Sequence, residues 1–140
     1  MSKSDRPYVL DDQIGFVLRR VTQRHLAIFS DAIPEVTTTQ FAALAKLAEL
    51  GPLSQNHLGR VTAMDAATIK GVVDRLAKLG FVETAADPDD RRRLTVSLSK
   101  AGRAIVSAKV ATALQVSAET LAPLTTEEAT ILKSLLVRLT

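Results

Sequence analysis

Residues 54–98 decide the fold of this 140-residue chain and read SQNHLGRVTAMDAATIKGVVDRLAKLGFVETAADPDDRRRLTVSL. Ser54 and Asp65 are residues of the type that caps helices, and apolar residues recur at helical spacing after each of them. Only residues 62–64 separate the two predicted helices. Two helices joined by so short a turn indicate a helix-turn-helix unit.

The period of the apolar pattern changes after Gly80, from helical spacing to alternation. Residues 81–85 predict a strand, residues 87–93 a turn that opens with Asp-Pro, and residues 94–98 a second strand in which apolar and hydroxyl side chains alternate. The sequence therefore predicts a two-stranded hairpin directly after the two helices. This order of elements is that of a winged helix-turn-helix.

Further helices are predicted on both sides of this segment. Asp11 or Asp12 can cap a first helix, and a capping box at Thr37 begins a second one. Beyond the hairpin, Ser99 can cap a long helix and Thr125 a final one. The first and last of these helices carry apolar stripes, formed by Ile14, Val17, Leu18, Val21 and Ile28 in one and by Ile131, Leu132, Leu135, Leu136 and Leu139 in the other.

We expect one domain over residues 1–140, mainly α-helical with a small β-hairpin wing. A winged helix-turn-helix lobe of about residues 37–99 does not need the apolar helices of about residues 11–33 and 100–140. Because helix-turn-helix proteins commonly meet pseudo-palindromic DNA with matching two-fold symmetry, we expect these helices to form a homodimer interface. Packing of the same stripes within one monomer is the alternative.

The composition excludes several classes of function. The chain has no cysteine, which rules out a disulfide framework, a thiolate zinc site and a thiol-based oxidation sensor. Its two histidines, His25 and His57, accompany no ligand-like cluster of carboxylates, so we expect no metal and no cofactor. No Ser-His-Asp grouping, phosphate-binding glycine loop or carboxylate pair indicates an enzyme. No signal sequence or membrane-length apolar segment is evident, so we expect a cytoplasmic protein with no membrane partner.

The positive charge is concentrated in one region of the chain. Residues 60–103 hold nine of the 18 basic residues and six acidic ones, so this stretch alone accounts for the formal net charge of +3. A local basic surface is typical of a face that binds phosphates. On charge alone, an ordinary solvated surface is the alternative.

The second helix of the unit has an outward face that suits a DNA groove. On a helical wheel, Ala67 and Gly71 lie at the centre of that face, and Thr68 and Lys70 flank them. Lys70 suits the acceptors of guanine, while Thr68 or Ala67 can contact a thymine methyl group. Gly71 allows close approach to a groove floor, with simple tolerance of glycine as the alternative. We expect Arg75 to contact a phosphate.

Polar residues before this helix and in the hairpin extend the predicted DNA-binding face. Ser54, Gln55 and Asn56 begin the preceding helix and can hold a phosphate, although a capping role alone would explain Ser54. In the hairpin, Asp90 precedes residues 91–93, three arginines at a tip with no core to support. An arginine there can enter a narrow minor groove, with Asp90 fixing its guanidinium by a charge-assisted hydrogen bond. A solvated loop is the alternative.

The motifs of this region resemble those of the MarR family of bacterial transcription regulators. They are LAKLGFV at residues 76–82, DPDDRR at residues 87–92, and LTVSLS at residues 94–99 followed by Gly102. The resemblance extends from about residue 12 to the C-terminus, and the Asp-Pro-x-Asp-Arg-Arg wing is its most specific part.

The resemblance implies a triangular homodimer built from the terminal helices. It further implies a recognition helix in the major groove of an operator, where Thr68 and Lys70 contact bases or phosphates. In the wing it implies that Arg91 enters the minor groove, that Asp90 orients it, and that Arg92 belongs to the same DNA-contacting tip.

Many members of that family release DNA when a small, often aromatic, anionic ligand binds between the dimer helices and the DNA-binding lobe. We expect His25, which lies on the apolar stripe of the first helix, and its neighbour Arg24 to bind such a carboxylate. A satisfied core or interface histidine is the alternative. Phe41 and Met64 can supply apolar walls, although both also suit the core, and Arg20 suits only a large phosphate-bearing effector such as a coenzyme A thioester.

The predicted function is therefore a DNA-binding transcriptional regulator, most simply a repressor that an aromatic acid or its coenzyme A thioester releases from a pseudo-palindromic operator. A winged-helix module that binds another protein, without specific DNA binding, is the alternative. That alternative predicts an uncharged wing and an exposed apolar patch. The basic wing tip of residues 90–93 favours DNA.

Overall fold

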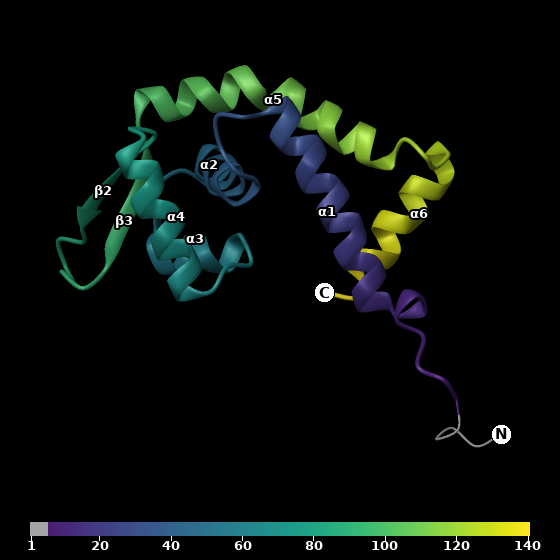
Figure 1. The fold of residues 1–140 in the computed structure, drawn as a ribbon. Coiled ribbons are helices and arrows are strands. Elements are labelled where there is room, and N and C mark those ends of the chain that lie inside the picture. Colours follow the sequence, from purple (N-terminus) through teal and green to yellow (C-terminus); the bar gives the residue numbers. More distant parts are fainter. Residues whose placement is uncertain (1–5) are drawn as a thin grey trace.

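The computed structural model describes residues 6–140 (Figure 1). Its elements, in chain order, are the 3-10 helix η2 (Leu10–Asp12), α1 (Ile14–Ala32), α2 (Thr38–Leu50), β1 (Leu53–Ser54), α3 (Gln55–Val61), α4 (Ala66–Lys78), β2 (Val82–Ala86), β3 (Leu94–Leu98), α5 (Lys100–Leu121) and α6 (Thr126–Val137). In Figure 1 the long helix α5 joins two parts: the winged unit lies at one of its ends and α6 at the other, with α1 packed against α5. None of the described helices is long and apolar enough to cross a membrane.

The start of each helix after α1 follows the local capping pattern of the sequence. In each case a side-chain oxygen accepts a hydrogen bond from the backbone N–H three residues later, and the capping residues are Thr37, Ser54, Asp65, Ser99 and Thr125. The prediction for α1 was wrong, because Asp11 and Asp12 lie in η2 and α1 begins after Gln13 without a side-chain cap. The Gln13 amide is turned back to the carbonyl of Val9 instead, at 2.9 Å.

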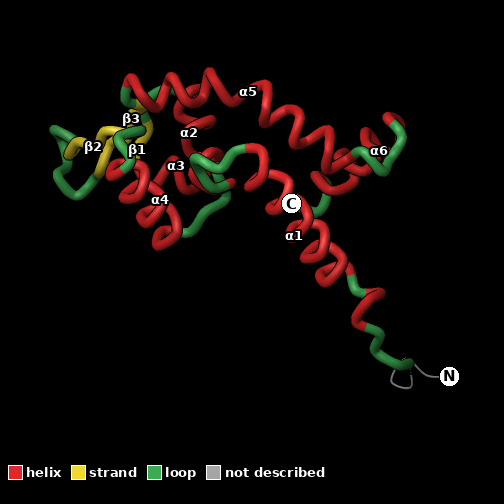
Figure 2. Tube along the Cα trace, turned by 45° about the horizontal axis from the view of Figure 1, so that its top comes forward, coloured by secondary structure: helices red, strands yellow, loops and turns green. Residues whose placement is uncertain are grey.

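The predicted hairpin is part of a three-stranded antiparallel sheet in the order β1-β3-β2. β2 pairs with β3 from Val82 opposite Leu98 to Ala86 opposite Leu94, one residue later than the sequence predicted. The third strand is the two-residue β1, in which Ser54 pairs with Thr95 and so places the start of α3 beside the wing. Figure 2 shows these strands together at the end of the molecule away from α6.

The core lies where α2, α3, α4 and β3 meet the end of α1 and the inner side of α5. Its fully buried side chains are Ile33, Leu44, Leu58, Ile69, Val73, Leu76 and Val96. Burying branched apolar side chains of this size is worth roughly 1.5–3 kcal/mol each before the entropic cost of ordering the chain. This core fixes α4 against α2 and α3 and leaves the opposite face of α4 in solvent.

The apolar stripes at both ends of the chain are not covered within one chain. Ile14 of α1 is 63% exposed and Ile131 of α6 is 57% exposed, and α6 has no buried residue. Packing within one monomer therefore does not account for these stripes. Figure 1 places α6 and the first turns of α1 toward the end of the molecule away from the wing.

Candidate functional site

Helix α4 presents the face that the sequence predicted. Ile69, Val72, Val73 and Leu76 are buried. Ala67, Thr68, Lys70, Gly71 and Arg75 are all exposed. An alanine Cβ at Gly71 would have no atom within 4 Å, so the centre of the face is open space. The Lys70 ammonium lies 2.8 Å from the Asp74 carboxylate one turn further on, which holds it along the helix surface.

Asp65 fixes the beginning of α4. Its carboxylate accepts a hydrogen bond of 2.7 Å from the backbone N–H of Thr68. This bond, made to the charged form, lowers the pKa of Asp65 below its ordinary value. The carboxylate is thus ionised and committed to capping, and it keeps the first turn of α4, with Ala67 and Thr68, in register with the rest of the unit.

The start of α3 differs in part from the prediction. Ser54 caps the helix by accepting from the backbone N–H of His57 at 3.2 Å, and Asn56 is exposed. Gln55 is only partly exposed, and its amide oxygen Oε1 is buried without a hydrogen-bond partner. The Gln55 oxygen therefore faces the protein rather than solvent.

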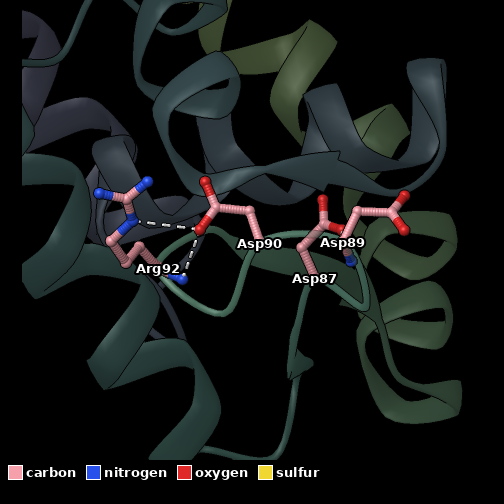
Figure 3. Close-up of polar contacts among 4 residues, drawn as sticks. All are labelled: Asp87, Asp89, Asp90 and Arg92. Atoms are coloured by element: carbon pink, nitrogen blue, oxygen red, sulfur yellow. Dashed lines mark hydrogen bonds and ion pairs between the residues drawn. The ribbon is translucent and has the colours of Figure 1, made fainter.

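The wing tip is a tight turn held by its own aspartates (Figure 3). The backbone N–H of Asp87 donates to the carbonyl of Arg93 at 2.8 Å, and that of Arg93 donates to the carbonyl of Asp90 at 2.9 Å. The Asp87 carboxylate accepts from the backbone N–H of Asp89 at 2.8 Å. These bonds close the turn locally, although the tip has no apolar core.

Asp90 orients Arg92 and not Arg91, which corrects the predicted pairing. Asp90 Oδ1 accepts from the Arg92 backbone N–H at 3.0 Å and from Arg92 Nε at 3.2 Å (Figure 3). Both contacts come from one residue because the turn directs the Arg92 side chain back over the carboxylate. Within residues 6–140 the side chain of Arg91 makes no hydrogen bond or ion pair, and it is exposed at the tip. Arg91 is therefore free to contact a partner.

Arg24 has a structural role that the sequence did not predict. Its guanidinium donates to the carbonyl oxygens of Thr120 at 2.7 Å and of Glu119 at 3.0 Å. These carbonyls belong to the last turn of α5, whose partial negative charge favours a cation. Arg24 thus caps α5 from α1, and the expected carboxylate ligand would have to compete with these two bonds.

His25 lies beside Arg24 and contacts the same turn of α5. Its Nδ1 is 2.8 Å from Thr120 Oγ1, and Thr120 Oγ1 donates to the carbonyl of Val116 at 3.0 Å. A hydroxyl has one proton, so in the contact with His25 the threonine oxygen accepts and Nδ1 donates. The neutral imidazole consequently carries its free lone pair on Nε2.

The other residues predicted for an effector do not meet His25 around one cavity. Phe41 packs edge-on against Phe29 with ring centroids 6.0 Å apart, and Arg20 is exposed on α1. Met64 lines a separate open hollow of about 220 Å³ beside α3 and α4. The five predicted residues therefore lie in at least three different environments.

A larger pocket of about 350 Å³ was missed by the sequence analysis. It lies between the end of α1, the loop before α2 and the end of α4, and its polar lining includes Ser30, Thr37, Gln40 and Arg75. Glu35 also lines it, and a 3.0 Å ion pair with Lys109 of α5 lowers the pKa of this glutamate. No local pattern could reveal this pocket, because its walls come from segments far apart in the chain.

The comparisons with known proteins agree on one family. Residues 36–94, from the start of α2 through the wing turn, match the model of the MarR family. The transcriptional repressor NicR of Pseudomonas putida is 42% identical to this chain over 113 residues, which cover 79% of this chain and 72% of NicR. The likeness therefore extends well beyond the matched segment.

Two solved structures share the fold over nearly the full length. A probable transcriptional regulator from Pseudomonas aeruginosa has a TM-score of 0.90 and 56% identity, covering 94% of this chain and 100% of that chain. BpsR of Bordetella bronchiseptica, whose DNA binding is regulated by 6-hydroxynicotinic acid, has a TM-score of 0.89 and 37% identity, covering 96% and 97%. Both matches include the terminal helices as well as the wing.

Proposed function

This chain belongs to the MarR family, and on that premise we propose that it is a transcriptional repressor that a small anionic aromatic ligand releases from its DNA operator. The regulator class follows from the family. The repressor role is supported by the likeness to NicR, which is a repressor. The observation that carries DNA binding is the wing tip, where Asp90 holds Arg92 while Arg91 stays exposed and unpaired among the described residues.

In this proposal α4 enters the major groove and the wing reaches the adjacent minor groove. Ala67 and Gly71 lie against the groove floor, and Thr68 and Lys70 contact base edges. Arg91 enters the minor groove, where a narrow groove has a strong negative potential. The phosphate contacts are assigned to Ser54, Asn56, Arg75 and Arg92, which position the protein without reading sequence.

We assign the exposed stripes of α1 and α6 to a homodimer interface. Leu18 of α1 and Leu132 of α6 are 39% and 37% exposed, and such continuous apolar surfaces are typical of interfaces between subunits. A two-fold dimer would present two copies of α4 to a pseudo-palindromic operator. Residues 37–99 would then be the DNA-binding lobe, and residues 11–33 and 100–140 the dimerisation region.

The effector is assigned to the region of His25. Because Thr120 fixes Nδ1 as a donor, a neutral His25 offers Nε2 as an acceptor for a hydroxyl or ring N–H of an aromatic acid. The regulation of BpsR by 6-hydroxynicotinic acid supports an effector of this class over a coenzyme A thioester. To act, the effector must bind the DNA-free arrangement of the two lobes more tightly than the DNA-bound one.

A gel-shift series in rising salt tests the proposal, with the DNA that precedes the gene as probe. We expect specific retention whose log affinity falls steeply with log salt, because phosphate contacts release counterions. A second series with 6-hydroxynicotinic acid and related aromatic acids should show release of the DNA. Absence of specific retention would contradict the proposal and favour a winged-helix module that binds another protein.

A further inference from the structure

A small polar hollow of about 50 Å³ separates the start of α3 from the base of the wing. It is lined by Ser54, Gln55, Asn56, Arg92, Arg93 and Leu94. Among residues 6–140, Gln55 Oε1 is the one buried side-chain nitrogen or oxygen that lacks a hydrogen-bond partner. Because a buried acceptor without a partner is destabilising, this atom requires an explanation.

The pairing of β1 with β3 places Gln55 at the wing. Ser54 lies opposite Thr95 in this antiparallel pair. Gln55 follows Ser54, and Leu94 precedes Thr95, so the two segments of the chain that leave this pair lie side by side at the hollow. The Gln55 amide is therefore directed to the base of the wing by the sheet register and not by a local motif.

The three arginines of the wing differ in the polar contacts that they make. All three residues are exposed. Arg91 has no polar partner among the described residues, and Arg92 is bound to Asp90 through Nε. Arg93 has its backbone fixed on both sides of the turn, by Asp87 and Asp90, and it lines the hollow. Among the described residues its guanidinium has no hydrogen-bond or ion-pair partner. A guanidinium carries several donors, and Arg93 lines the same hollow as Gln55, whose Oε1 lacks a partner.

We propose that Gln55 is a positioning residue for the wing, which rests on the proposed DNA binding. When DNA is bound, the Arg93 guanidinium donates to Gln55 Oε1 and ties the hairpin to α3. This charge-assisted hydrogen bond keeps Arg91 at a fixed position relative to α4, so that both grooves are contacted together. Gln55 thereby acts inside the protein, in place of the phosphate contact that the sequence suggested.

A double-mutant cycle in operator affinity tests the pairing. Gln55→Met keeps the length of the side chain and removes the acceptor, and Arg93→Ala removes the donors. We expect each variant to weaken operator binding roughly tenfold, and the double variant to bind about as well as either single one. Gln55→Glu keeps the acceptor and should retain affinity close to that of the wild type.

Gln55→Met combined with Arg75→Ala is the control. Arg75 lies on α4 and is assigned a phosphate contact that does not depend on the wing, so here the two losses should multiply. Amide exchange of residues 87–93 in the DNA complex should rise in Gln55→Met, while the thermal midpoint of the free protein should not fall, which separates positioning from a general structural role. If Gln55→Met misfolds, Gln55→Ala, which also removes the acceptor, takes its place in the cycle with Arg93→Ala. If the wild type binds DNA but the affinity losses of the Gln55 and Arg93 variants multiply in the double variant, this inference alone is overturned. If the wild type does not bind DNA, the proposed function is overturned.

Discussion

His25 of α1 and Thr120 of α5, 95 residues apart in the chain, share a hydrogen bond of 2.8 Å. The Thr120 hydroxyl also donates a hydrogen bond to the carbonyl of Val116, and the Thr120 carbonyl accepts one from the guanidinium of Arg24. One residue near the end of α5 thus fixes the tautomer of His25 and occupies Arg24. A ligand that binds His25 would therefore contact a residue whose hydrogen bond joins α1 to α5.

Replacing His25 with alanine should leave operator affinity intact and raise the effector concentration needed for release roughly tenfold, the cost of one lost hydrogen bond. Thr120→Val is the matched variant, because it keeps the shape of the side chain while removing the fixed tautomer. Titration of the DNA complex with 6-hydroxynicotinic acid measures the effect. Loss of both DNA binding and release would mean that His25 serves the fold or the dimer.

Replacing Arg91 with alanine should weaken operator binding by about 1–3 kcal/mol, since the contact proposed for it is in the groove. Lys46→Ala is the control, because Lys46 lies on α2 and pairs with Glu49 at 3.2 Å. Both variants are compared by gel shift at one salt concentration. Equal operator affinities of the two variants would show that Arg91 does not contact the DNA.

Replacing Gly71 with alanine should stabilise the protein by about 1 kcal/mol, because glycine is a poor helix former and an added Cβ meets no atom within 4 Å. If Gly71 lies against a groove floor, the same methyl group should weaken operator binding. Urea unfolding and gel shift measure the two effects. Unchanged affinity would mean that glycine is merely tolerated there.

Replacing Gly102 with alanine should have the opposite effect on stability. A Cβ at this position, in the first turn of α5, would overlap the carbonyl oxygen of Phe81. That carbonyl also accepts from the backbone N–H of Ser99 at 3.1 Å, so it cannot move freely. We expect a loss of about 1–3 kcal/mol in urea unfolding. An unchanged midpoint would contradict the close approach of α5 to the start of β2.

Acid should remove the stabilising effect of the Asp65 charge. Its pKa is lower in the folded protein than in the unfolded chain, because the Thr68 N–H donates to the carboxylate. The resulting stability is present above the ordinary carboxyl pKa and is lost as pH falls through the lowered folded value. Asp65→Asn keeps the cap without this titration, so the stability difference between the two proteins should shrink in that acid range. A difference that is constant with pH would contradict the assignment.

The sequence by itself determined the helices, the wing and the face of α4. Caps such as Thr37, Asp65 and Ser99 act over three residues, and the apolar period of α4 fixes which side is buried, so both can be recognised locally. The DPDDRR turn was recognised for the same reason. Within that turn, however, the sequence did not reveal that Asp90 binds Arg92 and not Arg91, because the geometry of the turn sets the directions of these side chains.

Only the tertiary structure decided which side chains are free to bind a partner. β1 is two residues long and has no periodicity of its own, yet its pairing with β3 buries the amide oxygen of Gln55. Arg24 was expected to bind a ligand but is occupied by carbonyls 95 and 96 residues away. A sequence pattern records the chemical type of a side chain, whereas its availability depends on the distant groups that folding brings within hydrogen-bond distance.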